Sequence, residues 1–281
     1  EEKSIETIKA AIDNGVNCID TAPTYGGMRG NSETITGKAI KGIREKVIIA
    51  TKFGTDPATS RSAIKGGGTK QYIMGAVEES LERLDTDYID LYQMHFPDAE
   101  TPIEETLRTL EDLITSGKVR FIGASNFASW QISESGWTSL TNELNQFVSL
   151  QTRYSVLTRD IEKEILPVCE KHQVSLLPYF PLESGLLTGK VTRDKEPPKG
   201  SRLALWKGAF TSEEKFNIID KLNDYGTEIG RNILEISLAW VAHRSQVGSV
   251  LVGATSPEQM IQNIDAISWD ISEEHIKAID E

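Results

Sequence analysis

Short apolar strands alternate with segments of helical periodicity along most of the chain, and this alternation limits the fold more than any other feature. The apolar, β-branched runs are NCIDTA, KVIIATKFG, YIDLYQMH, VRFIGASNF, FVSLQTRYSV, VSLLPYFPL and SVLVGAT. Between them, segments such as TKQYIMGAVEESLERL and IEETLRTLEDLITSG carry apolar residues at helical spacing. Strands separated by helices pair in parallel, because parallel neighbours need crossover connections. The sequence therefore predicts an α/β fold with seven visible parallel strands.

The polar residues at the strand ends distinguish two ways of closing such a sheet. Six polar side chains lie at or near the carboxyl ends of successive strands: Asp20, Lys52, His95, Asn126, Gln151 and Tyr179. In an open doubly wound sheet, ligand groups gather at one switch point, whereas in a (β/α)8 barrel every strand opens onto the same mouth. The pattern therefore favours the (β/α)8 TIM barrel. Because the opening helix needs a strand before it, we expect the first strand to be absent from the given sequence.

Length and composition fit one barrel domain over residues 1–281. A barrel fills a chain of this length as a single unit, and no repeat, linker or low-complexity tract divides it. The net charge of −12 would repel nucleic acid and anionic lipid, and no apolar run approaches the ~18 residues of a membrane span. Two cysteines without metal-ligand spacing, and a start without signal-peptide character, favour a cytoplasmic protein. We therefore expect small-molecule or protein partners, no nucleic acid, no membrane, and an oligomeric state that stays open.

Lys52 is the residue on which the catalytic interpretation depends. A lysine after an apolar strand needs a carboxylate partner in a barrel mouth, and Asp20 at the neighbouring strand end is the candidate. A lysine close to a tyrosine favours the phenolate and lowers a pKa that begins near ~10, which makes Tyr25 a usable proton donor. Taken from these residues alone, a structural ion pair beside a surface tyrosine is the alternative.

His95 gains its interest from its neighbours. A lone histidine after an apolar strand is more often a core residue than a catalyst, but Asp20, Lys52 and His95 end three consecutive strands, which lie side by side. An imidazole near the phenol is able to orient a carbonyl oxygen. One aspartate and one histidine with a lysine between them leave no tetrahedral set, so we expect no metal.

Further strand ends offer groups for a polar ring and for an anion. Ser125, Asn126 and Gln151 would bind a carboxamide, or else cap their strands, and Tyr179 would stack on the ring, or else pack in the core. The segment VLVGATSPEQMIQNI runs from a strand into a helix start, which is either a phosphate site or an ordinary helix terminus. Lys190 and Arg202 in the long connection add positive charge on the same side.

Together these motifs resemble the aldo-keto reductase family. The matching segments are DTAPTYG with a following SE, ATKFG, LYQMH, IGASNF, LQTRYS, YFPLESGLLTGK and GATSPEQ, in this order over nearly all of the chain. The resemblance is strongest to the branch that contains the potassium-channel β subunits and bacterial aldo/keto reductases. It implies a (β/α)8 barrel that holds NADP(H) across its mouth, and an oxidoreductase that transfers a hydride from NADPH to an aldehyde or ketone.

The resemblance also implies a role for each matching residue. Tyr25 becomes the general acid, tuned by Lys52 and Asp20, and His95 orients the substrate carbonyl. The implied cofactor-binding residues are Ser125, Asn126, Gln151, Tyr179, Phe180, Pro181, Leu182, Ser184, Gly185, Lys190, Arg202, Gly253, Thr255, Gln259, Gln262 and Asn263. Gln259 and Gln262 stand where many members have arginine and glutamate, so NADP(H) is expected and NAD(H) stays open.

Two other functions compete with an NADP(H)-dependent reductase. A non-catalytic NADP(H)-sensing subunit is the first, as the channel β subunits suggest. A Schiff-base aldolase that uses Lys52 is the second, although such a lysine should lie in an apolar pocket without a neighbouring carboxylate.

Overall fold

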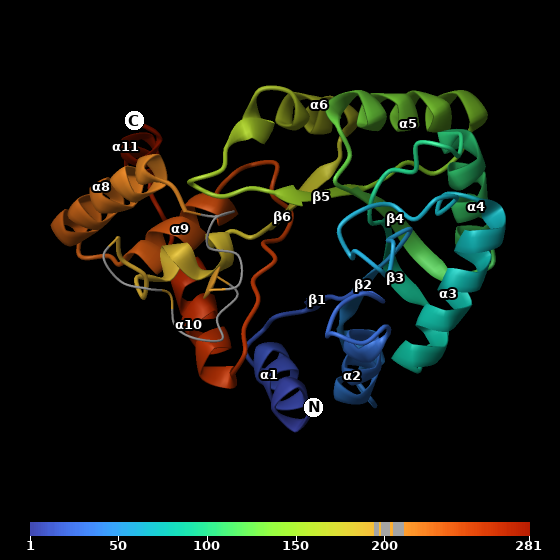
Figure 1. Cartoon of the computed structure of the whole chain (residues 1–281), viewed down its shortest axis with the longest axis horizontal. Helices are drawn as coiled ribbons and strands as arrows, with labels where there is room; N and C mark the ends of the chain where they lie inside the picture. The colour runs from blue at the N-terminus through green and yellow to red at the C-terminus, as the bar shows by residue number, and fades with distance from the viewer. Residues whose placement is uncertain (194–196, 198–202, 205–210) are drawn as a thin grey trace. The chain divides into compact units, whose positions relative to one another are not determined.

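A computed structural model describes residues 1–193, 197, 203–204 and 211–281. Figure 1 shows strands and helices alternating along the chain. The strands are β1 (Cys18–Asp20), β2 (Ile48–Phe53), β3 (Ile89–Met94), β4 (Val119–Ser125), β5 (Ser149–Arg153) and β6 (Ser175–Tyr179). The α-helices are α1 (Glu2–Asp13), α2 (Asn31–Ala39), α3 (Lys70–Leu84), α4 (Ile103–Thr115), α5 (Ser129–Asn142), α6 (Ile165–His172), α8 (Glu213–Ile229), α9 (Ile233–Ala242), α10 (Pro257–Ile267) and α11 (Glu273–Asp280). Short 3-10 turns are η1 (Arg44–Lys46), η2 (Asp160–Glu162) and η3 (Glu183–Thr188).

The described strands form one sheet in the order β1-β2-β3-β4-β5-β6. The pairing from β1 to β5 is parallel, with Lys52 opposite Gln93 and Ser125 opposite Gln151. Because side chains alternate between the two faces of a strand, residues paired in this register share a face. The parallel α/β sheet that the sequence predicts is confirmed, and its register brings the polar strand-end residues to one edge.

Two elements differ from the sequence prediction. The expected seventh strand, SVLVGAT, has no strand assignment. In this segment the amide of Leu251 donates to the carbonyl of Pro178 on β6 at 3.0 Å. Pro178 has no amide hydrogen, so it accepts from Leu251 but cannot itself donate to a neighbouring strand. Conversely, α11 was not predicted, although Ser272 caps it by accepting from the amide of His275.

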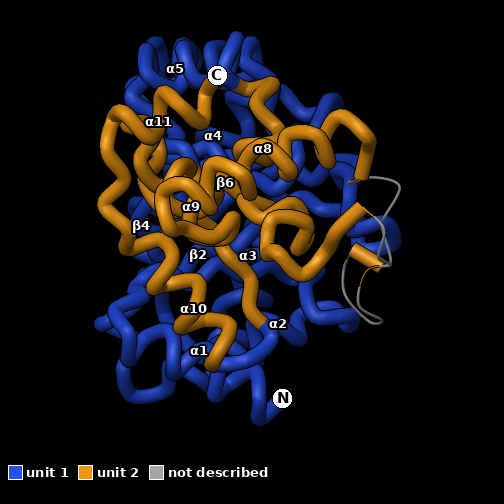
Figure 2. Tube along the Cα trace, turned by 90° about the vertical axis from the view of Figure 1, so that its left-hand side faces the viewer, with its two compact units in different colours: residues 1–152, 162–176, 255–257 blue, residues 153–161, 177–254, 258–281 orange. Residues whose placement is uncertain are grey.

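The chain divides into two compact units (Figure 2). Unit 1 comprises residues 1–152, 162–176 and 255–257, and therefore holds α1 to α6 with β1 to β4. Unit 2 comprises residues 153–161, 177–254 and 258–281, and holds η3, α8, α9 and α11. That the residues 1–281 act as one domain stays a prediction.

Helix α3 illustrates how the sequence builds unit 1. Ile73, Val77 and Leu84 recur at helical spacing and are completely buried where α3 packs against β2, α2 and α4. Burying such side chains stabilises the fold by about 1.5–3 kcal/mol each. Thr69 begins the helix by accepting a hydrogen bond from the amide of Tyr72.

No helix in the described part of the chain is long and apolar enough to cross a membrane.

Candidate active site

The site is built around the ion pair between Lys52 on β2 and Asp20 at the end of β1. Lys52 Nζ lies 2.7 Å from both carboxylate oxygens of Asp20 and donates to the carbonyl of Thr21 at 2.9 Å. The lysine side chain is 0% exposed and the aspartate side chain 14% exposed. Burial on its own lowers the pKa of Lys52, but the charges and hydrogen bonds of Asp20 and Tyr25 outweigh it, so this pKa lies above its ordinary value. The amine is therefore protonated at neutral pH.

Two glutamine side chains, on β3 and β5, hold the carboxylate of Asp20. Gln151 Nε2 donates to Asp20 Oδ1 at 2.8 Å, and Gln93 Nε2 approaches the same oxygen at 3.4 Å. A carboxylate only accepts hydrogen bonds, so it fixes which end of each amide faces it. Sequence reasoning missed Gln93. The available signal was its position on β3 two residues before His95, which places both residues on the inward face.

Tyr25 lies on the turn that follows β1, with 36% of its surface exposed. Lys52 Nζ is 4.8 Å from the centre of its ring, and a hydrogen bond to Tyr25 contributes to the raised pKa of Lys52. Gly26 and Gly27 shape this turn with φ of +88° and +84°, a region that favours glycine. Asn31, at the start of α2, donates to the carbonyl of Gly26 at 3.0 Å and fixes the turn. The phenol therefore lies against the buried ammonium and still faces solvent.

His95 follows β3 and is buried beside Tyr25. The two rings are 5.8 Å apart at 82°, and the imidazole also stacks on Phe96. Burial, and then the charge of Lys52, lowers the pKa of His95 to about 2, so the ring is neutral at physiological pH. Thr55 Oγ1 lies 2.6 Å from Nδ1. When the Thr55 hydroxyl donates to Nδ1, the ring proton is on Nε2. Thr55 is a second residue that sequence reasoning missed.

The depressed pKa of His95 predicts a specific dependence of stability on pH. The unfolded histidine takes up a proton near pH 6.5, whereas the folded one stays neutral until about pH 2, so stability is complete above pH 6.5 and falls below it. Between pH 7.5 and 5.5 we expect the free energy of unfolding of the wild type to drop by about 1.4 kcal/mol more than that of His95→Gln. Urea unfolding of both proteins at the two pH values measures this difference. An identical pH response of the two proteins would contradict the assignment.

Ser125 and Asn126 connect the ends of β3, β4 and β5. Asn126 adopts a left-handed φ of +61°. Its Nδ2 donates to the carbonyl of His95 at 2.9 Å and to Ser125 Oγ at 3.0 Å, and its backbone amide donates to the carbonyl of Gln151 at 3.0 Å. Asn126 thus ties together the three strand ends that carry His95, Ser125 and Gln151.

The structure thus brings together seven of the residues predicted in unit 1: Asp20, Tyr25, Lys52, His95, Ser125, Asn126 and Gln151. Most of the other predicted cofactor residues lie in unit 2. Tyr179 ends β6 with its ring edge-on to Phe180, and Pro181 to Gly185 form the following turn. Lys190 is exposed, and Arg202 lies outside the described residues.

The remaining predicted residues surround the start of α10. Gly253 and Thr255 are exposed before the helix, and Thr255 belongs to unit 1. On the helix itself, Gln262 is exposed, Gln259 half-buried and Asn263 buried.

The turn at residues 181–185 has a feature that fits a bound anion. Ser184 Oγ is buried and has no hydrogen-bond partner among the residues that the structure describes. Buried hydroxyls are nearly always hydrogen-bonded, so an external acceptor or donor is needed there. A cofactor bound at this turn, as the sequence resemblance implies, would meet that need.

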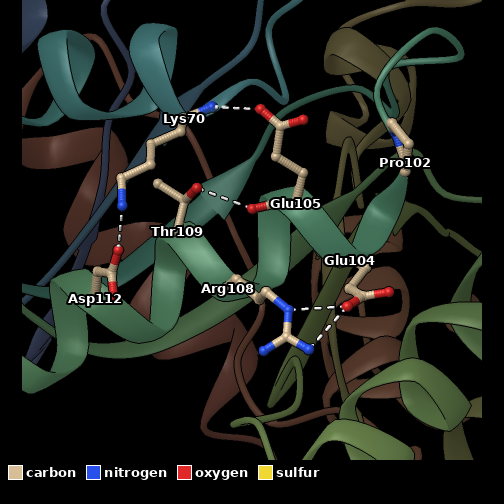
Figure 3. Close-up of a pocket in the computed structure, with 7 residues that line it drawn as sticks. All are labelled: Lys70, Pro102, Glu104, Glu105, Arg108, Thr109 and Asp112. Atoms are coloured by element: carbon tan, nitrogen blue, oxygen red, sulfur yellow. Dashed lines mark hydrogen bonds and ion pairs between the residues drawn. The ribbon is translucent and has the colours of Figure 1, made fainter.

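Two cavities in unit 1 differ in their relation to the site. A cavity of about 40 Å³ borders Lys52, Thr55 and Tyr72. A larger one, of about 430 Å³, lies along α4 and contains none of the site residues (Figure 3). Its cations are matched by carboxylates, because Lys70 pairs with Asp112 and Arg108 with Glu104. Of these two cavities, only the smaller one borders a predicted catalytic residue, Lys52.

Comparison with known proteins shows which ones this chain is similar to. The profile of the aldo/keto reductase family matches residues 1–281. The NADH-specific methylglyoxal reductase of Escherichia coli (strain K12) is 37% identical over 284 residues, covering 96% of this chain and 84% of that protein. A glycerol dehydrogenase structure from Gluconobacter oxydans matches with a TM-score of 0.83 and 33% identity, over 99% of this chain and 84% of that one. An aldo/keto reductase structure from Klebsiella pneumoniae, in complex with NADP and acetate, has a TM-score of 0.76 and 26% identity over the same shares of 99% and 84%. These matches confirm the predicted barrel class.

Proposed function

The chain belongs to the aldo/keto reductase family, and on that premise we propose that it is an NADPH-dependent reductase of aldehydes or ketones. The family uses nicotinamide cofactors. The observation that carries the proposal is the buried ammonium of Lys52, which contacts the carboxylate of Asp20 on one side and the phenol of Tyr25 on the other.

In this proposal Tyr25 donates the proton that the carbonyl oxygen needs. The charge of Lys52 favours the phenolate of Tyr25, so the phenol gives up its proton more readily than a free tyrosine. Asp20, held by Gln93 and Gln151, keeps the lysine charged and in place. With the Thr55 hydroxyl donating to Nδ1, neutral His95 would present Nε2–H to the same carbonyl oxygen. The bound nicotinamide supplies the hydride.

The residues that would hold the cofactor follow from the sequence resemblance. Ser125, Asn126 and Gln151 would bind the carboxamide, with Gln151 Oε1 facing it because Nε2 faces Asp20. In unit 2, the turn 181–185 and Lys190 would bind the pyrophosphate, and Tyr179 would stack on the nicotinamide ring. Gln259, Gln262 and Asn263 on α10 would bind the adenosine end.

NADPH is proposed as the preferred cofactor on the family resemblance and on the NADP complex of the Klebsiella protein. The Escherichia coli relative is named as NADH-specific, and Gln259 offers no positive charge to a 2′-phosphate. Steady-state rates on a panel of aldehydes and ketones with NADPH and NADH test both parts of the proposal. We expect carbonyl-dependent loss of reduced-nicotinamide absorbance, with the higher kcat/KM for NADPH. No loss with either cofactor would overturn the proposed function.

The Schiff-base aldolase is disfavoured by the state of Lys52. A Schiff-base lysine attacks as a neutral amine. Lys52 is completely buried, paired with Asp20, and has a raised pKa, so it carries a proton at neutral pH. Borohydride treatment with a carbonyl substrate is accordingly expected to leave Lys52 unmodified.

A further inference from the structure

Glu183 in unit 2 is a charged side chain at a position where a charge is unexpected. It is 0% exposed and begins the 3-10 turn η3, directly after the turn residues Pro181 and Leu182. Its backbone φ of +47° and the φ of +58° at Ser184 are left-handed values that residues other than glycine rarely adopt. Such conformations persist only where the surroundings hold them.

The surroundings of Glu183 supply two cations and two hydroxyls. Oε1 accepts from Ser155 at 2.9 Å, from Thr158 at 3.0 Å and from Arg153 Nε at 3.2 Å. Oε2 accepts from Lys215 at 2.7 Å and from the other end of the Arg153 guanidinium. Burial on its own raises the pKa of Glu183, but the hydrogen bonds and charges of Arg153 and Lys215 outweigh it and lower this pKa. The carboxylate is therefore ionised and fully bound.

These contacts join three segments that are distant in the sequence. Arg153 ends β5, Ser155 and Thr158 lie in the connection after it, and Lys215 lies in the first turn of α8. All of them belong to unit 2, as does the turn itself. Glu183 thus attaches the turn 181–185 to the end of β5, to the connection that follows β5 and to the first turn of α8.

We propose that Glu183 is a positioning residue that fixes the turn 181–185 in the conformation required to bind the dinucleotide phosphates. The assignment rests on the proposed function. Ser184, whose buried hydroxyl lacks a partner among the described residues, is the next residue, so the orientation of Glu183 determines where that hydroxyl lies. A turn that is ordered before the ligand arrives binds more tightly, because its ordering does not oppose association.

Dissociation constants of NADPH for the wild type and for Glu183→Gln test this assignment. The substitution keeps the size of the side chain and removes the charge that holds Arg153 and Lys215. We expect the Kd and KM for NADPH to rise about tenfold, with kcat at saturating NADPH changing much less. Hydrogen exchange of the ligand-free protein is expected to become faster in the segment 181–188, a local effect that general destabilisation would not produce.

Glu33→Gln is the matched control. Glu33 on α2 is also 0% exposed and is bound by Arg83 at 2.7 Å and Thr51 at 2.6 Å, but it lies in unit 1. We expect Glu33→Gln to lower the Tm while leaving the Kd for NADPH within about twofold of the wild type. Where Glu183→Gln does not fold, Lys215→Met takes its place, with an expected weakening of about threefold.

The outcomes separate this assignment from the proposed function. Unchanged NADPH binding by Glu183→Gln, or equal weakening by Glu33→Gln, overturns the role of Glu183 while the reductase stands. A wild type that binds neither NADPH nor NADH overturns the proposed function, and the assignment falls with it.

Discussion

Tyr25→Phe is expected to lower kcat for carbonyl reduction by about a thousandfold, within the range that general acid catalysis contributes. The substitution removes the hydroxyl that would transfer the proton and keeps the ring that contacts Lys52 and His95. The Kd for NADPH should stay within about twofold of the wild-type value, because the proposal gives the Tyr25 hydroxyl a role in protonating the substrate and none in binding the cofactor. Single-turnover rates with saturating NADPH and direct binding measurements give the two quantities.

Tyr72→Phe is the control for that experiment. Tyr72 on α3 lies in the same unit and lines the 40 Å³ cavity that Lys52 also lines. Its hydroxyl hydrogen-bonds to the backbone at Gly54, and we assign it no part in the reaction. The control is expected to keep nearly the full rate. If the wild type binds NADPH tightly but turns over negligibly, and Tyr25→Phe changes nothing, the protein is a cofactor sensor and Tyr25 has no catalytic role.

That the proposed catalytic residues lie close together was predictable, because parallel strands align their ends. Asp20 and Lys52 lie at or near the ends of their strands and His95 directly follows one, and parallel pairing of consecutive strands brings such positions together. The observed contact between Lys52 and Asp20 agrees with the expected pair. A buried lysine requires a partner of opposite charge, so the residue types alone indicated that Lys52 pairs with Asp20.

The polar support of the cluster was less visible in the sequence. Gln93 lies inside an apolar strand and Thr55 follows a glycine, so neither is distinctive until the register shows what each faces. Gln151 was predicted to bind the nicotinamide carboxamide, and the sequence did not indicate that its Nε2 also donates to Asp20. Side-chain amides have two unlike ends, and which end is used depends on neighbours that a sequence pattern does not identify.

The prediction of a seventh strand at SVLVGAT was wrong for a related reason. An apolar, β-branched run shows that a segment is buried and extended, but a strand also needs a neighbour with free donors and acceptors. Near residue 251 the neighbour is Pro178, which accepts and cannot donate. The attachment of Glu183 was hidden as well, because its partners lie in segments that only the tertiary fold brings together.

Lys52→Met is expected to have the second large effect, and on two properties at once. The substitution retains the length of the side chain and leaves the mostly buried carboxylate of Asp20 without its cation. Breaking a buried pair in this way costs about 3–5 kcal/mol of the free energy of unfolding. Activity should also fall by about a thousandfold, because Tyr25 loses the charge that makes it a good acid.

The double variant Asp20→Asn/Lys52→Met separates these two effects. With both charges removed, no buried charge lacks a partner, so most of the lost stability should return while the activity stays lost. In the residual rate of Lys52→Met, the decline at high pH should move to higher pH, because a tyrosine without a neighbouring cation ionises later. A double variant no more stable than Lys52→Met in urea unfolding would show that the pair does not hold the lysine. A Lys52→Met enzyme with the pH profile of the wild type would show that Lys52 does not tune the pKa of Tyr25.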